Sequence, residues 1–161
     1  MREAGAADVE LLGRLNEVVQ QVHHDALPRR FKSPDSAAAT AALARQVARP
    51  EVVAFIAEDD AEALGYAVAE ELRTPGTDLV VATSAVYLHH LAVVDAGRRR
   101  GVGRLLVSTV EEEARRRGVD EVRLDYWSFN EPAQRFFAAL GYAPYNVRAR
   151  RSVVCSGRVQ E

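Results

Sequence analysis

The chain has 161 residues, with 21 Lys and Arg against 23 Asp and Glu and a formal net charge of -2. This length suits one domain with a sizeable core, and the near-neutral charge does not favour a nucleic-acid-binding protein. A single cysteine, Cys155, excludes an internal disulfide and any CxxC metal or redox motif. The start of the chain has no apolar signal region, and no stretch approaches ~20 apolar residues, so we expect a cytoplasmic protein without a membrane segment.

The first half of the chain predicts two helices and then strands. Asp8 can cap a helix whose apolar stripe runs from Leu11 to Val22. A second, alanine-rich helix begins near residues 33–35 and ends before Pro50. Residues 52–57 and 64–70 are typical of a hairpin with a polar turn. Residues 74–78 indicate a loop, which leads to a strand ending near Val94.

The second half predicts a helix over 103–117 stopped by Gly118, a strand over 122–126, a short helix after Asn130 and a last strand over 147–154. These elements indicate an α/β fold of the α+β type, in which a mixed sheet is covered by helices on both faces. No internal repeat or low-complexity linker divides the chain. We therefore expect residues 1–161 to form one domain.

An apolar strand, a basic glycine turn and a helix start follow one another between Leu91 and Val107. A helix N-terminus leaves its first amides unpaired and carries a partial positive charge, which favours phosphate oxygens. Gly101 and Gly103 lack a Cβ, so the backbone can approach a bulky pyrophosphate. The arginines at 98–100 add long-range attraction for the same polyanion. The segment therefore predicts an anion site.

Two nucleotide-binding motifs do not fit this turn. A Walker loop needs four residues between its glycines and then Lys-Ser/Thr, whereas one residue separates Gly101 from Gly103 and Arg104-Leu105 follows. A dinucleotide fingerprint needs a third glycine where Leu106 stands. The pattern that remains is Arg-x-x-Gly-x-Gly after a strand.

A second motif lies downstream, from Asn130 to Tyr142. Asn130 is a natural N-cap, Pro132 is tolerated in a first helical turn, and Gly141 can close the helix in a left-handed conformation. Taken in order, the two motifs resemble the coenzyme A loop and the Asn-helix-Leu-Gly-Tyr segment of the GNAT superfamily of N-acetyltransferases, over roughly residues 85–145.

The resemblance implies a mostly antiparallel sheet in which two strands splay around acetyl-coenzyme A, with no metal ion. The pantetheine arm would pair with the backbone of the first strand, with the Val93 amide near the thioester oxygen. Amides from Arg98 to Arg104 would hold the pyrophosphate. The Asn130 side chain would contact the pantetheine arm. The coenzyme-binding set is then Leu91, Ala92, Val93, Arg98, Arg99, Arg100, Gly101, Val102, Gly103, Arg104, Asn130, Ala133, Phe136 and Phe137.

The resemblance also directs attention to proton transfer. An amine must lose a proton before it attacks a thioester. Strand alternation puts Tyr87 and His89 on one face and His90 on the other. Members of the resembled family hold a base at the positions of Tyr87 and His89. His89 is the candidate base, against a structural histidine, and Tyr87 is either catalytic or a packing aromatic. In many members a tyrosine protonates the thiolate. Phe137 stands at that position, and Tyr142, Tyr145, Tyr126 or water could replace it as the proton donor.

The function expected is direct acetyl transfer from acetyl-coenzyme A to a primary amine of a small molecule or protein. The alternative, motivated by Phe137, is a catalytically weak acyl-coenzyme A sensor or partner-binding module. We expect an amine acceptor as partner, no nucleic acid and no membrane, and a homodimer is an open possibility. Residues 23–31, between the first two helices, would lie on the acceptor side in family members, although a solvated helix end is the favoured interpretation.

Overall fold

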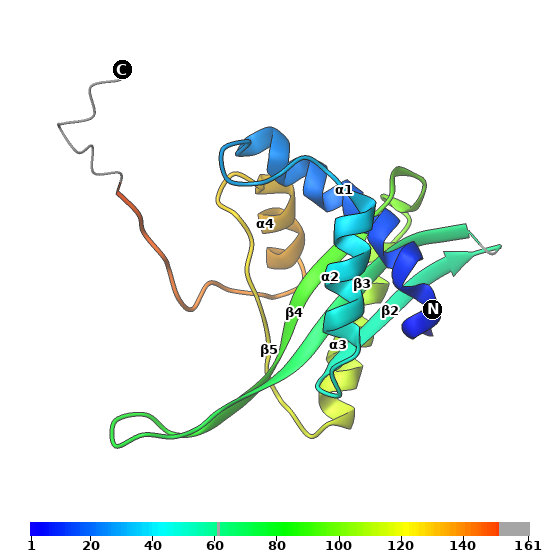
Figure 1. The fold of residues 1–161 in the computed structure, drawn as a ribbon. Coiled ribbons are helices and arrows are strands. Elements are labelled where there is room, and N and C mark those ends of the chain that lie inside the picture. The colour runs from blue at the N-terminus through cyan, green and yellow to red at the C-terminus, as the bar shows by residue number, and fades with distance from the viewer. Residues whose placement is uncertain (61, 152–161) are drawn as a thin grey trace. The chain divides into compact units, whose positions relative to one another are not determined.

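One sheet organises the computed structural model, which describes residues 1–60 and 62–151 (Figure 1). Its strand order is β1-β2-β3-β4-β5, and every neighbouring pair is antiparallel except the parallel pair β4 and β5. The strands are β1 (Arg2–Glu3), β2 (Val52–Asp59), β3 (Glu62–Thr74), β4 (Thr83–Val93) and β5 (Val122–Leu124). The helices are α1 (Val9–Ala26), α2 (Ser36–Val47), α3 (Val102–Arg116) and α4 (Glu131–Ala138), with short 3-10 turns at Ala6–Asp8 and Asp95–Gly97.

The contacts divide the chain into a larger unit, Met1–Phe129, and a smaller unit, Asn130–Glu161. The larger unit contains the whole sheet and α1 to α3, and α4 belongs to the smaller one. The predicted mixed sheet is confirmed, with five strands that are mostly antiparallel.

The first two helices cover one face of the sheet. α2 begins where Asp35 accepts a hydrogen bond from the Ala38 amide at 3.0 Å, which satisfies one of the unpaired donors of the first turn. Helix and strand side chains then share one apolar cluster, in which Leu12, Tyr66 and Val68 are fully buried. The stripe predicted on α1 is therefore its core face, although Val22 at its end is exposed.

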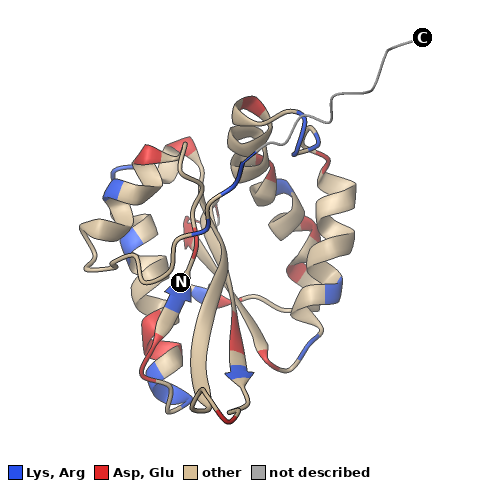
Figure 2. Cartoon of the chain, turned by 90° about the vertical axis from the view of Figure 1, so that its left-hand side faces the viewer, with Lys and Arg blue, Asp and Glu red and all other residues tan. Residues whose placement is uncertain are grey.

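The opposite face of the sheet carries α3. Gly65 points to this side, because a Cβ built on it would lie 3.3 Å from Leu106 Cδ1 and only 2.5 Å from the Ala92 carbonyl oxygen of β4. The absence of a side chain at Gly65 thus allows β3, β4 and α3 to approach closely. Figure 2 shows Lys, Arg, Asp and Glu mainly on helices and near strand ends, with the middle of the sheet largely uncharged.

Two predictions about strands need correction. The hairpin of β3 and β4 is longer than the sequence indicated, and its loop over 75–82 exposes Leu79 and Val81 at 94% and 79%. Residues 147–151 are not a strand. The rest of the predicted last strand, 152–154, and Cys155 lie outside the described residues.

The smaller unit is built around α4, and both predicted boundaries of this helix are confirmed. The Asn130 side chain accepts a hydrogen bond from the Ala133 amide at 3.2 Å. Gly141 follows the helix with φ of +92°, the left-handed conformation that glycine adopts without strain. The Tyr142 amide donates to the Phe137 carbonyl at 3.0 Å, and the two rings meet edge to face at 5.7 Å.

We expect Gly65→Ala to lower the free energy of unfolding by about 1–3 kcal/mol, because the new methyl group must displace the backbone of β4. Gly5→Ala is the matched control, since nothing lies within 4 Å of a Cβ there. Urea denaturation of both variants measures the difference. Equal stability of the two would contradict the close approach at Gly65.

Candidate functional site

Beyond Leu88, no strand among the described residues pairs with the outer edge of β4. The parallel pairing joins only Val86 with Val122, Tyr87 with Arg123 and Leu88 with Leu124. The Val94 amide donates to the Leu64 carbonyl of β3 at 3.0 Å. Because backbone groups alternate between the two sides of a strand, those of Val93 and Leu91 face the open edge and those of Ala92 face β3. The edge therefore presents backbone donors and acceptors at the predicted pantetheine positions.

The open edge leads directly into the glycine turn. Gly101 is the residue before α3 and has φ of +82°, and Arg99 also lies in the left-handed region with φ of +62°. The first helical hydrogen bond runs from the Leu105 amide to the Gly101 carbonyl at 2.9 Å. The amides of residues 102–104 precede that bond, so helix geometry gives them no partner within α3. Together with the helix dipole, these amides have the geometry that the predicted anion site requires.

The arginines of the turn differ in their partners. Arg98 pairs with Asp95 at 2.9 Å and Arg100 pairs with Asp59 at 2.6 Å. For the exposed Arg99 and Arg104, the described part of the chain contains no ion pair. Carboxylates thus offset the charges of Arg98 and Arg100, whereas those of Arg99 and Arg104 are not offset by an ion pair among the described residues.

A β-bulge in β4 sets the orientation of the histidines. Val68 and Ala69 are consecutive in β3 but pair with His90 and Leu88, so His89 is the extra residue. Its Nε2 lies 2.9 Å from Oε2 of the buried Glu70, which also forms an ion pair with Arg49. Bulges re-aim side chains in this way.

The prediction that His90 faces away from His89 is wrong. His90 pairs with Val68 and stacks on Tyr66 at 6.2 Å, both on the face covered by α1 and α2. Glu70 lies on this face as well, since it is two and four residues beyond Val68 and Tyr66 in β3. Regular alternation fails here because the bulge adds one residue to β4 only.

The environment of His90 keeps its ring neutral. Burial lowers the pKa of His90 to about 4, and the nearby His89 and His23 act in the same direction. Burial also lowers the pKa of His23, against the opposing effect of Asp125. Tyr87 lies opposite Glu70, and its ring centroid is 4.9 Å from that of His89.

Residues 23–31 form part of an aromatic cluster, whereas the sequence favoured a solvated helix end. His23 stacks on Phe31 at 4.8 Å, and Phe31 meets Trp127 edge to face at 5.3 Å. The Arg30 guanidinium lies over the Trp127 ring at 4.6 Å. The sequence analysis did not identify Trp127 and Phe129, which follow β5. Two large aromatic residues in a short loop could have indicated a functional surface there.

The remaining predicted residues belong to the smaller unit. Asn130 uses its side-chain oxygen as the cap of α4, which leaves its amide nitrogen as the group that could contact a ligand. Phe137 is buried and lies against Phe136 and Tyr142, with ring centroids at 5.1 and 5.7 Å. Ala133 lies on the first turn of α4.

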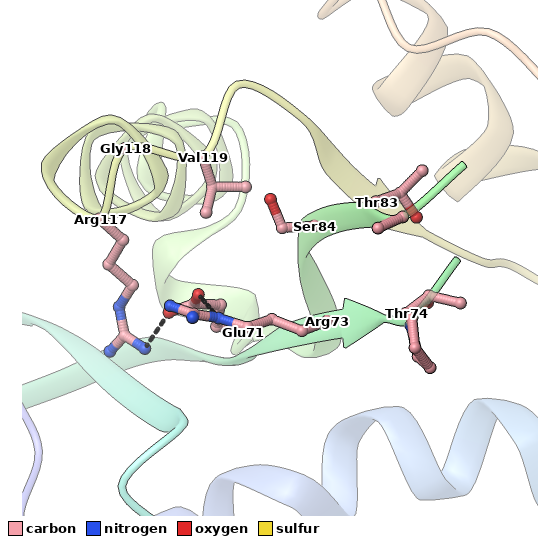
Figure 3. A pocket seen from close by; sticks show the side chains of 10 residues that line it. Glu71, Arg73, Thr74, Thr83, Ser84, Arg117, Gly118 and Val119 are labelled. Atoms are coloured by element: carbon pink, nitrogen blue, oxygen red, sulfur yellow. Dashed lines mark hydrogen bonds and ion pairs between the residues drawn. The ribbon is translucent and has the colours of Figure 1, made fainter. Parts of the chain in front are cut away.

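A cavity of about 570 Å³ lies elsewhere in the larger unit (Figure 3). Its lining includes Glu71, Arg73 and Arg117, which are joined by ion pairs, and residues at the loop end of the β3–β4 hairpin. Arg117 follows the last residue of α3, so this cavity is about 22 Å along the helix axis from the glycine turn. It does not coincide with the predicted coenzyme site.

Residues 1–60 and 62–151 carry neither a candidate metal cluster nor a candidate membrane-spanning helix. This part of the chain contains no cluster of three or more His, Cys, Asp or Glu placed to hold a metal ion. It also contains no helix that is both long and apolar enough to cross a membrane.

A family model described as the acetyltransferase (GNAT) family matches residues 19–142. The chain therefore belongs to the GNAT family of acetyltransferases.

Two curated relatives match parts of the chain. Aminoglycoside N(6')-acetyltransferase type 1 of Klebsiella aerogenes is 34% identical over 100 residues, which cover 62% of this chain and 64% of the relative. The uncharacterized N-acetyltransferase YdgE of Bacillus subtilis is 28% identical over 67 residues, 42% of this chain and 43% of the relative. The matches thus span less than two thirds of each relative.

Solved structures agree on the fold. A tetramutant of the BH1408 protein from Bacillus halodurans has a TM-score of 0.88 at 25% identity and covers 94% of this chain and 98% of its own. An aminoglycoside N-acetyltransferase, AAC(6')-Iy in complex with CoA, has a TM-score of 0.73 at 21% identity, covering 96% of this chain and 93% of its own.

The low pKa of His90 makes stability depend on pH. Between pH 6.5 and about 4 the unfolded chain holds a proton at this site that the folded protein does not, so stability falls as the pH falls. We expect His90→Phe, which cannot titrate, to reduce this loss by up to about 1.4 kcal/mol per pH unit. Urea denaturation at several pH values measures the slopes. Identical slopes of stability against pH in the parent protein and His90→Phe would refute the assignment of this pH dependence to His90.

Proposed function

We propose that this protein is an acetyl-coenzyme A-dependent N-acetyltransferase that transfers the acetyl group directly to a primary amine. The observation that carries the proposal is the continuous path from the open edge of β4 to the amides at the start of α3. We further propose that the two units act as one acetyltransferase domain, because the family model extends from residue 19 to residue 142 across both.

The residues of the path fit the two ends of the coenzyme. Backbone groups of Leu91 and Val93 would pair with the amides of the pantetheine arm, as in the addition of a strand to a sheet edge. The amides of residues 102–104 would hold the pyrophosphate, because they combine unpaired donors with the helix dipole. The solved relative in complex with CoA supports this use of the fold.

His89 is the proposed general base. It lies where β4 and β5 separate, and its side chain is 29% exposed, so it can reach both solvent and a bound amine. The bound coenzyme supplies an acetyl thioester. A new C–N bond forms as the C–S bond breaks, the amine proton passes to His89, and the Val93 N–H stabilises charge that develops on the thioester oxygen.

The thiolate that leaves must gain a proton. Phe137 cannot donate one, and Tyr142 packs against it, which makes Tyr142 the proposed proton donor, directly or through water. Phe137 also favours a second candidate function, a catalytically weak acyl-coenzyme A sensor. Such a protein would bind the coenzyme without turnover.

The acceptor class is proposed only as a primary amine. The curated aminoglycoside acetyltransferase that matches this chain supports a small-molecule amine. A panel of aminoglycosides, polyamines, amino acids and peptide amines, assayed for release of the free thiol of coenzyme A, tests the proposal. Failure to bind acetyl-coenzyme A at millimolar concentration would refute it, and binding without turnover would favour the sensor.

We expect Gly101→Val to weaken acetyl-coenzyme A binding by at least about 100-fold, because a branched side chain is strained at φ of +82° and relief of the strain would move the turn that presents the amides. Gly118→Val is the matched control, since Gly118 has φ of +70° and lies just beyond the other end of α3. Arg99→Ala should weaken binding by about 10-fold or less. Calorimetry measures all three, and equal losses for Gly101→Val and Arg99→Ala would contradict the role of the amides.

We expect His89→Gln to lower kcat by about 10²- to 10⁴-fold, the usual contribution of a positioned base. The KM for acetyl-coenzyme A should change little, because the proposed binding groups are backbone atoms. Steady-state kinetics on the best acceptor of the panel measures both constants. An unchanged kcat would remove His89 from the mechanism.

A further inference from the structure

Glu70 is a buried carboxylate in direct contact with the proposed base. Its side chain is 9% exposed, and it lies on β3 directly opposite Tyr87 of β4. Charged side chains are rarely buried unless they are paired. Glu70 meets this requirement through two different partners, Arg49 and His89.

Arg49 holds both carboxylate oxygens. Its Nη2 bonds to Oε1 of Glu70, and its Nη1 donates to Oε2 at 3.3 Å. Burial by itself raises the pKa of Glu70, but the hydrogen bonds from Arg49 and His89 outweigh burial and leave the pKa below its ordinary value. Glu70 is therefore ionised near neutral pH and can only accept hydrogen bonds.

This fixes the tautomer of His89. An acceptor-only carboxylate 2.9 Å from Nε2 requires that Nε2 carry the hydrogen. The lone pair of the neutral ring then lies on Nδ1. The described residues provide no other hydrogen-bond partner for the His89 ring than Glu70, so Nδ1 is left to take a proton from an acceptor amine.

We propose that Glu70 is a positioning residue that holds His89 in the Nε2–H tautomer, so that Nδ1 is the basic atom, and that Arg49 keeps Glu70 ionised. This inference rests on the proposed function for its kinetic consequence, but the tautomer can be observed without turnover. The other titratable or charged groups around the pair are Glu51, which lies 3.8 Å from Arg49, and Tyr87 and His90 of β4.

Glu70→Gln gives the sharpest test. Arg49 binds an amide oxygen in preference to an amide nitrogen, so the glutamine would turn its NH₂ group toward Nε2 and force the hydrogen to Nδ1. Nitrogen-15 NMR of the imidazole distinguishes the two tautomers. We expect Nε2–H in the parent protein and Nδ1–H in Glu70→Gln, with a fall in kcat of at least about 10-fold and little change in the KM for acetyl-coenzyme A.

Glu113→Gln is the matched control. Glu113 is as buried as Glu70, at 8% against 7%, and also forms two arginine ion pairs, with Arg116 and Arg117, but it does not contact His89. Hydrogen bonds from these arginines, above all Arg116, lower the pKa of Glu113. We expect Glu113→Gln to leave the His89 tautomer and kcat as in the parent protein, although it loses a buried ion pair.

Arg49→Met provides a second variant. The Arg49 side chain is about half exposed, so its replacement should leave the fold intact. Loss of the guanidinium removes the hydrogen bond and the charge that offset the burial of Glu70, so the pKa of Glu70 should rise. A protonated Glu70 can donate to Nε2 of His89, so Arg49→Met should gain the Nδ1–H tautomer relative to the parent protein, as Glu70→Gln does.

The outcomes separate the two proposals. An unchanged tautomer in Glu70→Gln would overturn the role of Glu70, and an unchanged tautomer in Arg49→Met would overturn the role of Arg49. A changed tautomer with no acetyl transfer by the parent protein to any amine would leave the positioning intact and refute the proposed function.

Discussion

The extra residue in β4 is the constraint on which the candidate site depends. A bulge adds one residue to one strand, bends it and increases its twist. Here it turns His89 toward Glu70 and places His90 against Tyr66. Pairing with β5 also ends at Leu88, one residue before the bulge. The same irregularity therefore accompanies both the free backbone edge and the orientation of the proposed base.

Two buried carboxylates show how the fold places charge next to its core. Glu70 on β3 and Glu113 on α3 lie on different elements, and each is bound by arginine. A buried carboxylate without a partner would cost several kcal/mol. Glu70 differs from Glu113 because one of its oxygens also meets a histidine. The arginine thus makes burial tolerable, and the remaining acceptor capacity becomes available to orient the imidazole.

Local features of the fold could be predicted from the sequence. The caps at Asp35 and Asn130 and the left-handed Gly101 depend on side chains and backbone within a few residues, so their patterns are visible in the chain. The bulge could not be predicted, because it depends on the register between β3 and β4, which only pairing defines. His90 was assigned to the wrong face for this reason.

The contact between Glu70 and the proposed base could not be predicted either, because the two residues are far apart in the sequence. Glu70 is 19 residues from His89, and Arg49 is a further 21 residues away. A usable signal did exist, since Glu70 continues the period-two pattern of Tyr66 and Val68 and so puts a charge on a core face. The coenzyme-binding side chains of the smaller unit stay predictions.

The short β5 has a consequence for the order in which the sheet forms. β2, β3 and β4 are consecutive antiparallel neighbours, so their contacts are local in sequence. β5 can pair with β4 only in parallel, after the intervening helix has packed on the sheet, and it contributes three residue pairs. Contacts with greater sequence separation form more slowly. We therefore expect β5 to dock after β2, β3 and β4 have paired and its amides to exchange with solvent before those of β3, so the edge beside the proposed coenzyme site should open more readily than the centre of the sheet.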